Sequence, residues 1–471
     1  MKILFVDLIR HYYDQHGVYS LAAVIKTLPG AQVGYIAARR FDKAIKLILR
    51  SKPDLIFYSS FSPNLPIYAA FDALLKKTMN VPSLIGGPGP TYDWPLLKGT
   101  TFDAICLGEG EYALKEFIQN GLRPAKNIIR NGEAFPKEFY PFIDLDRIPL
   151  PERSIIYEQD SLLREMPSKQ FLSGRGCPYH CTYCFNHVYE EMFKTCGMYV
   201  RKKSVDYLLE EIADVKKKYP LQDVCFNDDV FILDKKWFWE FAEKFPRNFK
   251  LNYTCNVRAN LINEDIVRAL KQSGCRAVNW SIETGNERLR NVVLKRQMRD
   301  EMIYQTAGLL KKYKITFRIG NLLGIPGETL GQMDETIAMN IRARPFLAQA
   351  NIFVPYTGLE LTNYAIEKYH YFVMPVDKLP KNYFARTVMN IPSKMKRLIR
   401  RRLYLFPFFV EYPALFFTPF LKRLALSIPE CFTQPVYKFV NAFKLRRVYL
   451  PKITFKLGIR IAYRHFHGEQ A

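Results

Sequence analysis

Short apolar runs alternate with amphipathic stretches along most of the chain, and in residues 1–125 this alternation predicts a parallel, doubly wound sheet. Ligands on such sheets bind at the carboxyl ends of the strands. The predicted strands are Lys2–Val6, Asp54–Tyr58, Ser83–Ile85 and Ala104–Leu107. The predicted helices are Gly17–Thr27, Asp42–Ser51 and Pro66–Lys77.

The same alternation returns in residues 165–360, where six strand–helix units predict a partial (β/α) barrel with its active site at the carboxyl ends of the strands. The predicted strands are Gln170–Ser173, Asp223–Phe226, Lys250–Cys255, Ala277–Ile282, Thr316–Leu323 and Gln349–Val354. The predicted helices are Val205–Lys218, Lys235–Phe245, Glu264–Gln272, Asp300–Tyr313 and Gly331–Arg344.

Two segments lack this alternation. Residues 127–164 are rich in proline, which is typical of a connection between domains. Residues 361–471 interleave aromatic and basic residues with prolines and predict a mostly helical region. We therefore expect an α/β domain over 1–126, a linker over 127–164, a TIM-like (β/α)6 barrel over 165–360 and a helical C-terminal region over 361–471.

The composition is that of a folded globular protein, because 48% of the 471 residues are hydrophobic and 24% are charged. The formal net charge is +24. Residues 371–471 hold 19 Lys and Arg against 4 Asp and Glu, which leaves +15. This asymmetry indicates an anionic partner, with a solvated basic surface as the alternative. Nucleic acid is not expected, because no nucleic-acid-binding module accompanies the charge.

The basic cluster Lys394–Arg402 is followed by the almost wholly apolar stretch Leu403–Leu421. That stretch has the length of a membrane span, about 20 residues. Pro407, Pro413 and Pro419 would interrupt a single helix, so three short proline-started helices are expected. A basic cluster beside aromatics is typical of a segment that lies on a membrane surface. A helical cap that packs against the barrel is the alternative.

Cys177, Cys181 and Cys184 lie in the loop after the first predicted barrel strand. Three ligands would leave one iron of a [4Fe–4S] cluster open for a substrate or cosubstrate. A zinc site normally needs four protein ligands, and His180 or His187 would supply the last one, so zinc remains an alternative. Clustered cysteines in a chain without a secretory signal pattern indicate a reducing, cytoplasmic compartment.

The motif Cys-x3-Cys-x-Tyr-Cys after the first strand of a partial barrel resembles the radical S-adenosylmethionine (SAM) enzymes, from about Met166 to Gly358. The resemblance implies that the open iron chelates SAM close to Tyr183. It also implies that an external electron donor, flavodoxin-like or ferredoxin-like, supplies the electron that cleaves SAM to a 5′-deoxyadenosyl radical.

Three further strand ends match the SAM contacts that the resemblance implies. Asp228 and Asp229 end the second strand, where the family binds the SAM amino group. Glu283 ends the fourth strand, where the family binds the ribose hydroxyls. Gly324 follows the fifth, near the adenine and methionine parts. Ordinary loop carboxylates are the alternative for the aspartate pair. For the Pro-Gly-Glu-Thr segment after Gly324, the alternative is a turn that only leads the chain into the next helix.

A flavodoxin-like sheet before such a barrel resembles the cobalamin-binding (B12) radical SAM subfamily. Small residues at three adjacent strand ends would leave room for a nucleotide tail, and backbone N–H groups there would bind its phosphate. The cobalamin-binding residues so implied are Ser60, Ser62, Gly86, Gly87, Pro88, Gly108 and Glu109.

One cobalamin motif is only partly matched. Asp14 and His16 fit the start of Asp-x-His-x-x-Gly, but Tyr19 replaces the glycine. We therefore expect base-off cobalamin without a histidine ligand, and His16 as a loop or helix-start residue. A degenerate domain that binds no cobalamin is the alternative.

Together these features predict a cobalamin-dependent radical SAM enzyme that methylates an unactivated carbon of a small-molecule or lipid substrate. The resemblance implies that one SAM molecule remethylates cobalamin and a second yields the radical. Another radical reaction (rearrangement, cyclisation, carbon–carbon coupling or methylthiolation) and a non-catalytic binding module are the alternatives. We expect the protein in the cytoplasm, with peripheral contact to the inner membrane face.

Overall fold

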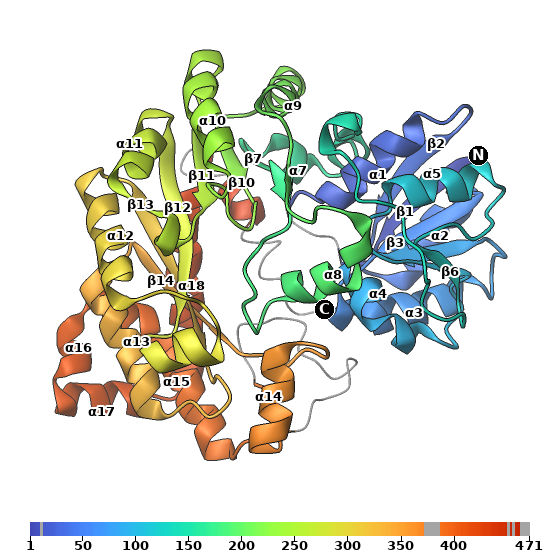
Figure 1. The fold of residues 1–471 in the computed structure, drawn as a ribbon. Helices are drawn as coiled ribbons and strands as arrows, with labels where there is room; N and C mark the ends of the chain where they lie inside the picture. The colour runs from blue at the N-terminus through green and yellow to red at the C-terminus, as the bar shows by residue number, and fades with distance from the viewer. Residues whose placement is uncertain (10–12, 372–386, 450–452, 455–456, 462–471) are drawn as a thin grey trace.

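The computed structural model describes residues 1–9, 13–371, 387–449, 453–454 and 457–461. Two α/β lobes lie next to each other, the N-terminal lobe on the right of Figure 1 and the barrel on the left. The remaining residues, which include 372–386 and 462–471 of the predicted C-terminal region, lie outside the described part of the chain.

A six-stranded sheet forms the N-terminal lobe in the order β2-β1-β3-β4-β5-β6. All of its pairs are parallel except β5–β6. Helices α1 and α5 cover one face and α2 and α3 the other, which confirms the doubly wound prediction. The strands are β1 Lys2–Asp7, β2 Gln32–Ala37, β3 Leu55–Ser59, β4 Ser83–Gly86, β5 Ala104–Cys106 and β6 Ile128–Arg130. The helices are α1 His16–Lys26, α2 Phe41–Ser51, α3 Leu65–Leu75, α4 Pro88–Asp93 and α5 Glu111–Gln119.

Two edge strands were not predicted. β2 is only partly buried, so it carries no continuous apolar run of the kind that marks β1 and β3. β6 has three residues and lies in the segment predicted as linker, so the N-terminal sheet extends past residue 126.

The barrel sheet has six parallel strands in the order β14-β13-β12-β11-β10-β7, which confirms the partial (β/α) barrel. Its strands are β7 Ser168–Phe171, β10 Asp223–Phe226, β11 Asn252–Asn256, β12 Cys275–Glu283, β13 Thr316–Leu323 and β14 Leu347–Ile352. Its helices are α9 Val205–Lys218, α10 Lys235–Asn248, α11 Glu264–Gln272, α12 Asp300–Lys312 and α13 Leu330–Ala343. Short elements at the junction of the lobes are α6 Ser154–Tyr157, α7 Ser161–Glu165, α8 Phe185–Met192 and the ribbon of β8 Gly174–Arg175 and β9 Arg201–Lys202.

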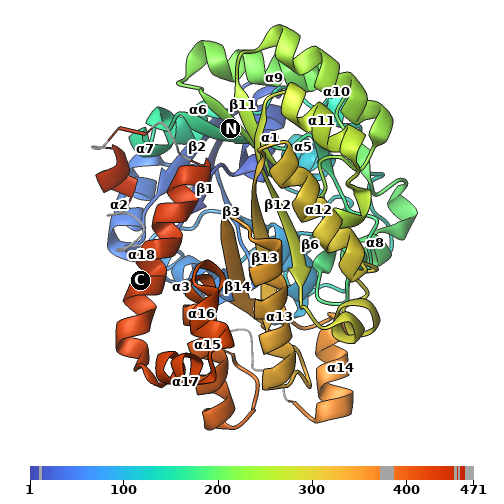
Figure 2. The ribbon, with the colours of Figure 1, turned by 90° about the vertical axis from the view of Figure 1, so that its left-hand side faces the viewer.

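The C-terminal region is helical, and its helix α15 (Ser393–Glu411) extends the barrel wall next to β14 (Figure 2). Side chains of α15 pack on α13 and β14, where Ile399, Leu403 and Phe406 are buried. Arg402 and Lys422 both pair with Asp334 of α13, so part of the basic cluster is used inside the fold. The helices are α14 Glu360–Tyr369, α15 Ser393–Glu411, α16 Pro413–Phe417, α17 Pro419–Ser427 and α18 Glu430–Tyr449.

The prediction of three proline-started helices was wrong for Pro407, which lies inside α15. Pro413 and Pro419 do begin α16 and α17. Pro407 costs the helix one backbone hydrogen bond, but the burial of Phe406 and Phe409 on either side offsets that loss. None of the described helices combines the length and the apolar character that a membrane crossing requires.

The two lobes are joined through a buried charge cluster around Arg153, a residue of the predicted linker. The Arg153 guanidinium lies 3.4 Å from Asp14 of the N-terminal lobe and 3.1 Å from Glu211 of α9. It also donates to the backbone oxygen of Gln170 in β7 at 2.7 Å. Asp14 accepts from the Gln170 N–H at 2.8 Å and from the Tyr157 hydroxyl at 2.6 Å. One buried network therefore fixes β7 against the N-terminal lobe.

Replacing Asp14 with Asn should lower the free energy of unfolding by about 3 kcal/mol, because it removes one partner of a buried ion pair. Denaturant titration followed by circular dichroism measures the loss. The matched control is Asp42→Asn, whose ion pair with Arg40 is exposed and whose loss should leave the transition in place. Equal effects of the two changes would contradict the anchoring role of Asp14.

Candidate active site

The three predicted cluster ligands lie on one loop at the carboxyl end of β7. Cys177 and Cys181 are buried and Cys184 is half-buried, and Cys184 donates its N–H to the Cys181 carbonyl at 3.0 Å. Burial raises the pKa of Cys177 to about 11 and that of Cys184 to about 12. These thiols would therefore lose their protons on binding metal.

Two arginines that were not predicted approach Cys181. Arg258 donates to the Cys181 sulfur at 3.6 Å and Arg296 at 3.9 Å. The Arg258 guanidinium also stacks on the Tyr179 ring, 3.7 Å from its centroid. Buried guanidinium donors favour a thiolate over a thiol, so this donor set fits a cluster held by thiolates. Arg258 lies just after the carboxyl end of β11, where site residues are expected, so the sequence could have suggested it as a site residue. Arg296 lies in a long loop, and no sequence pattern marks it.

Tyr183, Glu283 and Arg296 form a hydrogen-bonded group beside the cysteines. The Tyr183 hydroxyl donates to Glu283 at 2.9 Å and accepts from Arg296 at 2.8 Å, and Arg296 lies 3.7 Å from Glu283. Glu283 has a φ of +64°, a conformation that costs energy for a residue with a side chain. The structure therefore brings the predicted Tyr183 and Glu283 together at the end of β12.

The aspartate pair after β10 divides into a buried and an open residue. Asp228 is buried and accepts from the Ser173 N–H at 3.0 Å and from Lys202 at 2.9 Å, so it holds the cysteine loop in place. Asn227 and Asp229 on either side are exposed. Desolvation by its surroundings raises the pKa of Asp229, while a hydrogen bond from Asn186 opposes the rise. Asp229 rather than Asp228 is thus open to a ligand.

Gly324 is held by the carboxyl group of Glu328, which accepts from the Gly324 N–H at 2.7 Å and the Ile325 N–H at 3.2 Å. Burial raises the pKa of Glu328 to about 8. A Cβ at Gly324 would lie 3.4 Å from Ile399 of α15. The turn after β13 therefore touches the C-terminal region.

The zinc alternative finds no support in the side chains around the cysteines. His180 lies 3.1 Å from Glu190 instead of joining the thiols. Within the described ranges, no three His, Cys, Asp or Glu side chains converge on a position for a single metal ion.

In the N-terminal lobe, the predicted serine and glycine loops contact each other at the carboxyl edge of the sheet. Ser60 donates its N–H to Gly86 at 3.0 Å and accepts from the Gly89 N–H at 2.8 Å. Gly87 has a φ of +97°, and a Cβ there would lie 3.0 Å from the Ser60 carbonyl. Ser62 is buried, while Ser59, Phe61 and Pro88 are exposed at this edge. The glycines thus permit close approach of two loops and leave an open polar and aromatic edge.

The third predicted loop lies between the lobes. A Cβ at Gly108 would lie 2.8 Å from the Phe193 ring. Glu109 pairs with Arg175 of β8 at 2.9 Å and with Arg201 of β9 at 2.6 Å. Glu109 is therefore engaged in the interface between the lobes, which sequence reasoning did not foresee.

His16 is the first residue of α1, as expected. Its Nε2 atom is buried without a hydrogen-bond partner among the described residues. Burial and the nearby Arg153 lower the pKa of His16 to about 4. This side chain lies in the charge cluster between the lobes and not at the open edge formed by Ser59 and Phe61.

The open edge of the N-terminal sheet and the cysteine loop of the barrel meet at Tyr92 and Phe185. Tyr92 belongs to α4, which follows the Gly86–Gly87 loop, and Phe185 follows Cys184 directly. Their rings stack with centroids 4.3 Å apart, and the Tyr92 hydroxyl donates to the Phe185 carbonyl at 3.3 Å. Burial raises the pKa of Tyr92, and Cys184 and Asp229 add to the rise, so all three groups are close. The serine and glycine loops therefore adjoin the cysteine loop.

Family comparison agrees with this geometry. Residues 171–339 match the radical SAM superfamily, and residues 6–118 match the B12 binding domain. The chain is a radical SAM protein with an N-terminal B12 binding domain. Its expected cofactors are accordingly a [4Fe–4S] cluster, SAM and cobalamin.

Two curated relatives cover most of the chain. The uncharacterized methyltransferase PH0819 of Pyrococcus horikoshii is 26% identical over 69% of this chain and 72% of its own length. The cytidylyl-2-hydroxyethylphosphonate methyltransferase of Streptomyces wedmorensis is 24% identical over 75% of this chain and 73% of its own. Among solved structures, the radical SAM methyltransferase TsrM of Kitasatospora setae has the same fold, with 15% identity, a TM-score of 0.61 and coverage of 77% of this chain and 74% of that one.

Changing Cys177, Cys181 and Cys184 together to Ala should abolish the iron–sulfur absorption band and SAM cleavage while the fold survives. Iron analysis and circular dichroism measure the two effects. The matched control is Cys275→Ala, a buried cysteine of β12 outside the loop, which should retain its iron. About four irons per chain in the triple variant would exclude this cluster site.

Protein reconstituted with hydroxocobalamin should show a base-off absorption spectrum. His16→Ala should leave that spectrum unchanged, because the imidazole lies in the charge cluster between the lobes and away from the open edge. Phe61→Ala should weaken cobalamin binding by removing an exposed ring at that edge. A spectral shift in the His16 variant would identify His16 as a cobalt ligand and refute this assignment.

Proposed function

We propose that the protein is a cobalamin-dependent methyltransferase that acts on an unactivated carbon by radical chemistry. The observation that carries this proposal is the stacked Tyr92–Phe185 pair, which joins the B12 binding domain to the cysteine loop. A methyl donor bound at one edge would then lie close to a radical generated at the other. Both curated relatives described above are named methyltransferases, which supports the same reaction class.

When bound, the cluster and SAM supply a 5′-deoxyadenosyl radical and cobalamin supplies the methyl group. The chain's own residues hold and orient these groups. Cys177, Cys181 and Cys184 bind the cluster, and Arg258 and Arg296 stabilise the Cys181 thiolate by donating to its sulfur.

The open polar groups around the triad are suited to SAM. Asp229 and its neighbour Asn227 offer acceptors for the amino group at the end of β10. Glu283, fixed by Tyr183, offers a carboxylate for the ribose hydroxyls. The backbone near Gly324 would lie along the adenine and methionine parts of SAM. Glu328 fixes the conformation of this turn by accepting from the Gly324 N–H.

Cobalamin would lie on the carboxyl edge of the N-terminal sheet. The residues proposed to surround it there are Ser60, Ser62, Gly86, Gly87 and Pro88, together with the exposed Ser59 and Phe61. Gly108 and Glu109 are proposed to border the cobalamin as well. Thr91 ties the Gly108 loop to this edge, because it accepts from the Gly108 N–H at 3.0 Å and donates to the Gly87 carbonyl at 2.9 Å.

The proposed partners are a small-molecule or lipid substrate and an external flavodoxin-like or ferredoxin-like electron donor. We also propose peripheral contact with an anionic membrane face through the basic C-terminal region. Lys and Arg near such a surface each contribute about 1 kcal/mol of attraction. The cytoplasmic side of the inner membrane is the compartment that this contact favours.

Reconstituted enzyme given reductant and SAM labelled in its methyl group should transfer the label to the substrate and release 5′-deoxyadenosine. The natural substrate is sought by mass spectrometry of cell extract incubated with the enzyme. A labelled product that needs added cobalamin supports the proposal. Formation of 5′-deoxyadenosine with an unlabelled product would assign another radical reaction.

The matched variants for this assay are Glu283→Gln and Glu287→Gln. Glu283→Gln should raise the KM for SAM at least several-fold, because it removes the carboxylate beside Tyr183. Glu287→Gln changes a nearby glutamate outside this group and should not. Equal KM values in both variants would remove Glu283 from the proposed SAM site.

A further inference from the structure

Many large apolar side chains are exposed on α16–α18 and on the turns beside these helices. The three helices lie at the edge of the barrel in Figure 2. Nine of the twenty large hydrophobic residues that the described chain exposes fall between positions 412 and 443. We call these nine the apolar face: Tyr412, Phe417, Phe420, Leu424, Ile428, Phe432, Val436, Phe439 and Phe443. Large apolar side chains that are exposed close together on a protein surface mark an interaction site.

The geometry of α18 shows that this exposure is ordered. Its four exposed members, Phe432, Val436, Phe439 and Phe443, are spaced by four, three and four residues and so form one stripe along the helix. The opposite side of the helix, with Tyr437 and Asn441, is buried against the protein. α18 therefore presents aromatic rings outward while its polar tyrosine and asparagine face inward.

The charge around the apolar face is strongly positive. Residues 393–449 hold twelve Lys and Arg against two Glu, a formal charge of +10. Arg446 and Arg447 are exposed next to the α18 stripe, and Arg423 is exposed beside Phe420 and Leu424. Apolar side chains rimmed by arginines complement an anionic bilayer, whose headgroups attract the charge and whose interior accepts the rings.

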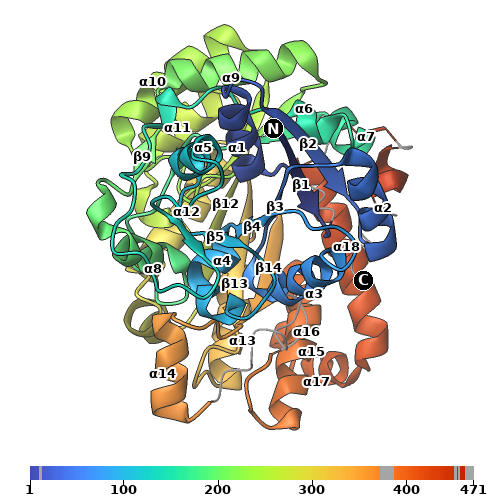
Figure 3. The same ribbon diagram turned by 90° about the vertical axis from the view of Figure 1, so that its right-hand side faces the viewer.

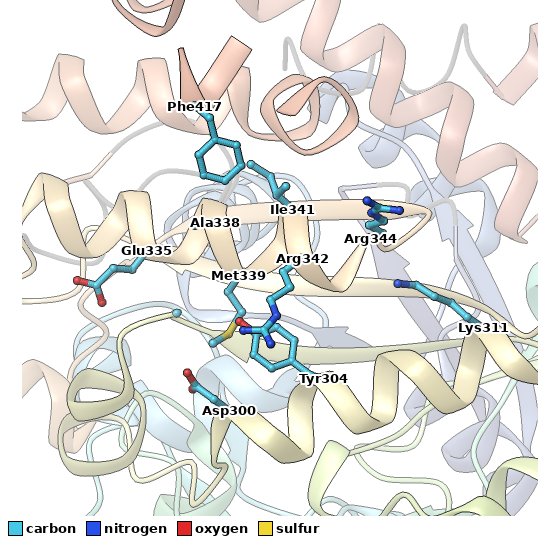
Figure 4. A pocket seen from close by; sticks show the side chains of 11 residues that line it. Asp300, Tyr304, Lys311, Glu335, Ala338, Met339, Ile341, Arg342, Arg344 and Phe417 are labelled. Atoms are coloured by element: carbon cyan, nitrogen blue, oxygen red, sulfur yellow. The ribbon is translucent and has the colours of Figure 1, made fainter. Parts of the chain in front are cut away.

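A pocket of about 760 Å³ on the adjoining barrel wall has the same character (Figure 4). Phe417 points into it from above, and Lys311, Arg342 and Arg344 line it. Its acids are already satisfied, since Asp300 pairs with Arg290 and Glu335 accepts from Asn286. Arg342 stacks on the Tyr304 ring, 4.0 Å from its centroid. Desolvation and the nearby Arg344 charge lower the pKa of Lys311, so the positive charges lie close together here. The pocket is thus suited to an anionic headgroup.

We infer that the apolar face docks on an anionic lipid bilayer, with Phe417, Phe420 and the α18 stripe in the interfacial region and Arg423, Arg446 and Arg447 at the headgroups. A second copy of the chain is a poorer occupant, because it would bring two like charges of +10 together. The inference rests on the proposed membrane contact and is independent of methyl transfer. Docking by α16 and α17 leaves the interface between the lobes clear, since these helices lie at the opposite end of the molecule from the N-terminal lobe (Figures 1 and 3).

The test is co-sedimentation of full-length protein with vesicles of phosphatidylcholine alone or mixed with phosphatidylglycerol. We expect strong binding to the mixed vesicles only, with several-fold loss in high salt. The triple change Phe420→Ser, Phe432→Ser and Phe439→Ser should weaken binding at least tenfold. The control Leu96→Ser, Met198→Ser and Trp239→Ser removes three exposed large apolar groups elsewhere on the surface and should bind as wild type does.

A second comparison tests the contribution of charge to vesicle binding. The double change Arg446→Gln and Arg447→Gln removes two positive charges from α18, and its control, Lys217→Gln with Lys235→Gln, removes two from α9 and α10. Only the first pair should weaken binding to anionic vesicles. Binding that survives the triple Phe change would overturn the docking face while leaving the membrane contact in place. No vesicle binding by wild type, or dimers that the Phe change dissociates, would overturn both.

Discussion

The buried Arg153 guanidinium is the interaction on which the relative position of the two lobes depends. It is almost fully buried, and its partners come from the N-terminal lobe, from β7 and from α9. A buried charge lowers the stability of the fold unless its partners are in place. The lobes must therefore be positioned so that Asp14, Glu211 and the Gln170 carbonyl all reach Arg153. Because β7 leads into the cysteine loop, the same network that joins the lobes also positions the three cysteines.

In a parallel sheet the carboxyl ends of all strands lie at one edge. In this molecule that edge of the N-terminal sheet faces the same edge of the barrel sheet. The Arg153 network holds the lobes at one end of the interface, and the Glu109 pairs with Arg175 and Arg201 hold the middle. Tyr92 and Phe185 then close the contact beside Cys184. Glu109, which the resemblance assigns to cobalamin, thus also takes part in this apposition.

Strong periodicity made most of the fold predictable. Helices α9 and α11 and strands β10 and β13 have the bounds that were expected, because each combines a clear apolar pattern with capping or turn residues at its ends. The half-exposed β2 was missed because edge strands bury too little to carry an apolar run. Pro407 was misread because the local rule against proline in helices is overridden by burial of its neighbours.

The site was predictable only where a short motif carries it. Cys177, Cys181, Cys184 and Tyr183 stand within eight residues, whereas Arg258 and Arg296 reach Cys181 from distant loops. Likewise Asp228 and Asp229 are indistinguishable in sequence, and only the fold shows that the first is buried in a network with Ser173 and Lys202.

The B12 binding edge and the cysteine loop face each other across the interface between the lobes, where Tyr92 stacks on Phe185. The most direct measurement is electron paramagnetic resonance of protein that holds cob(II)alamin and the reduced cluster together. We predict a dipolar broadening of the cob(II)alamin signal when the cluster is reduced, absent in the triple cysteine variant. A signal that stays unbroadened on reduction, with both groups fully bound, would contradict this arrangement.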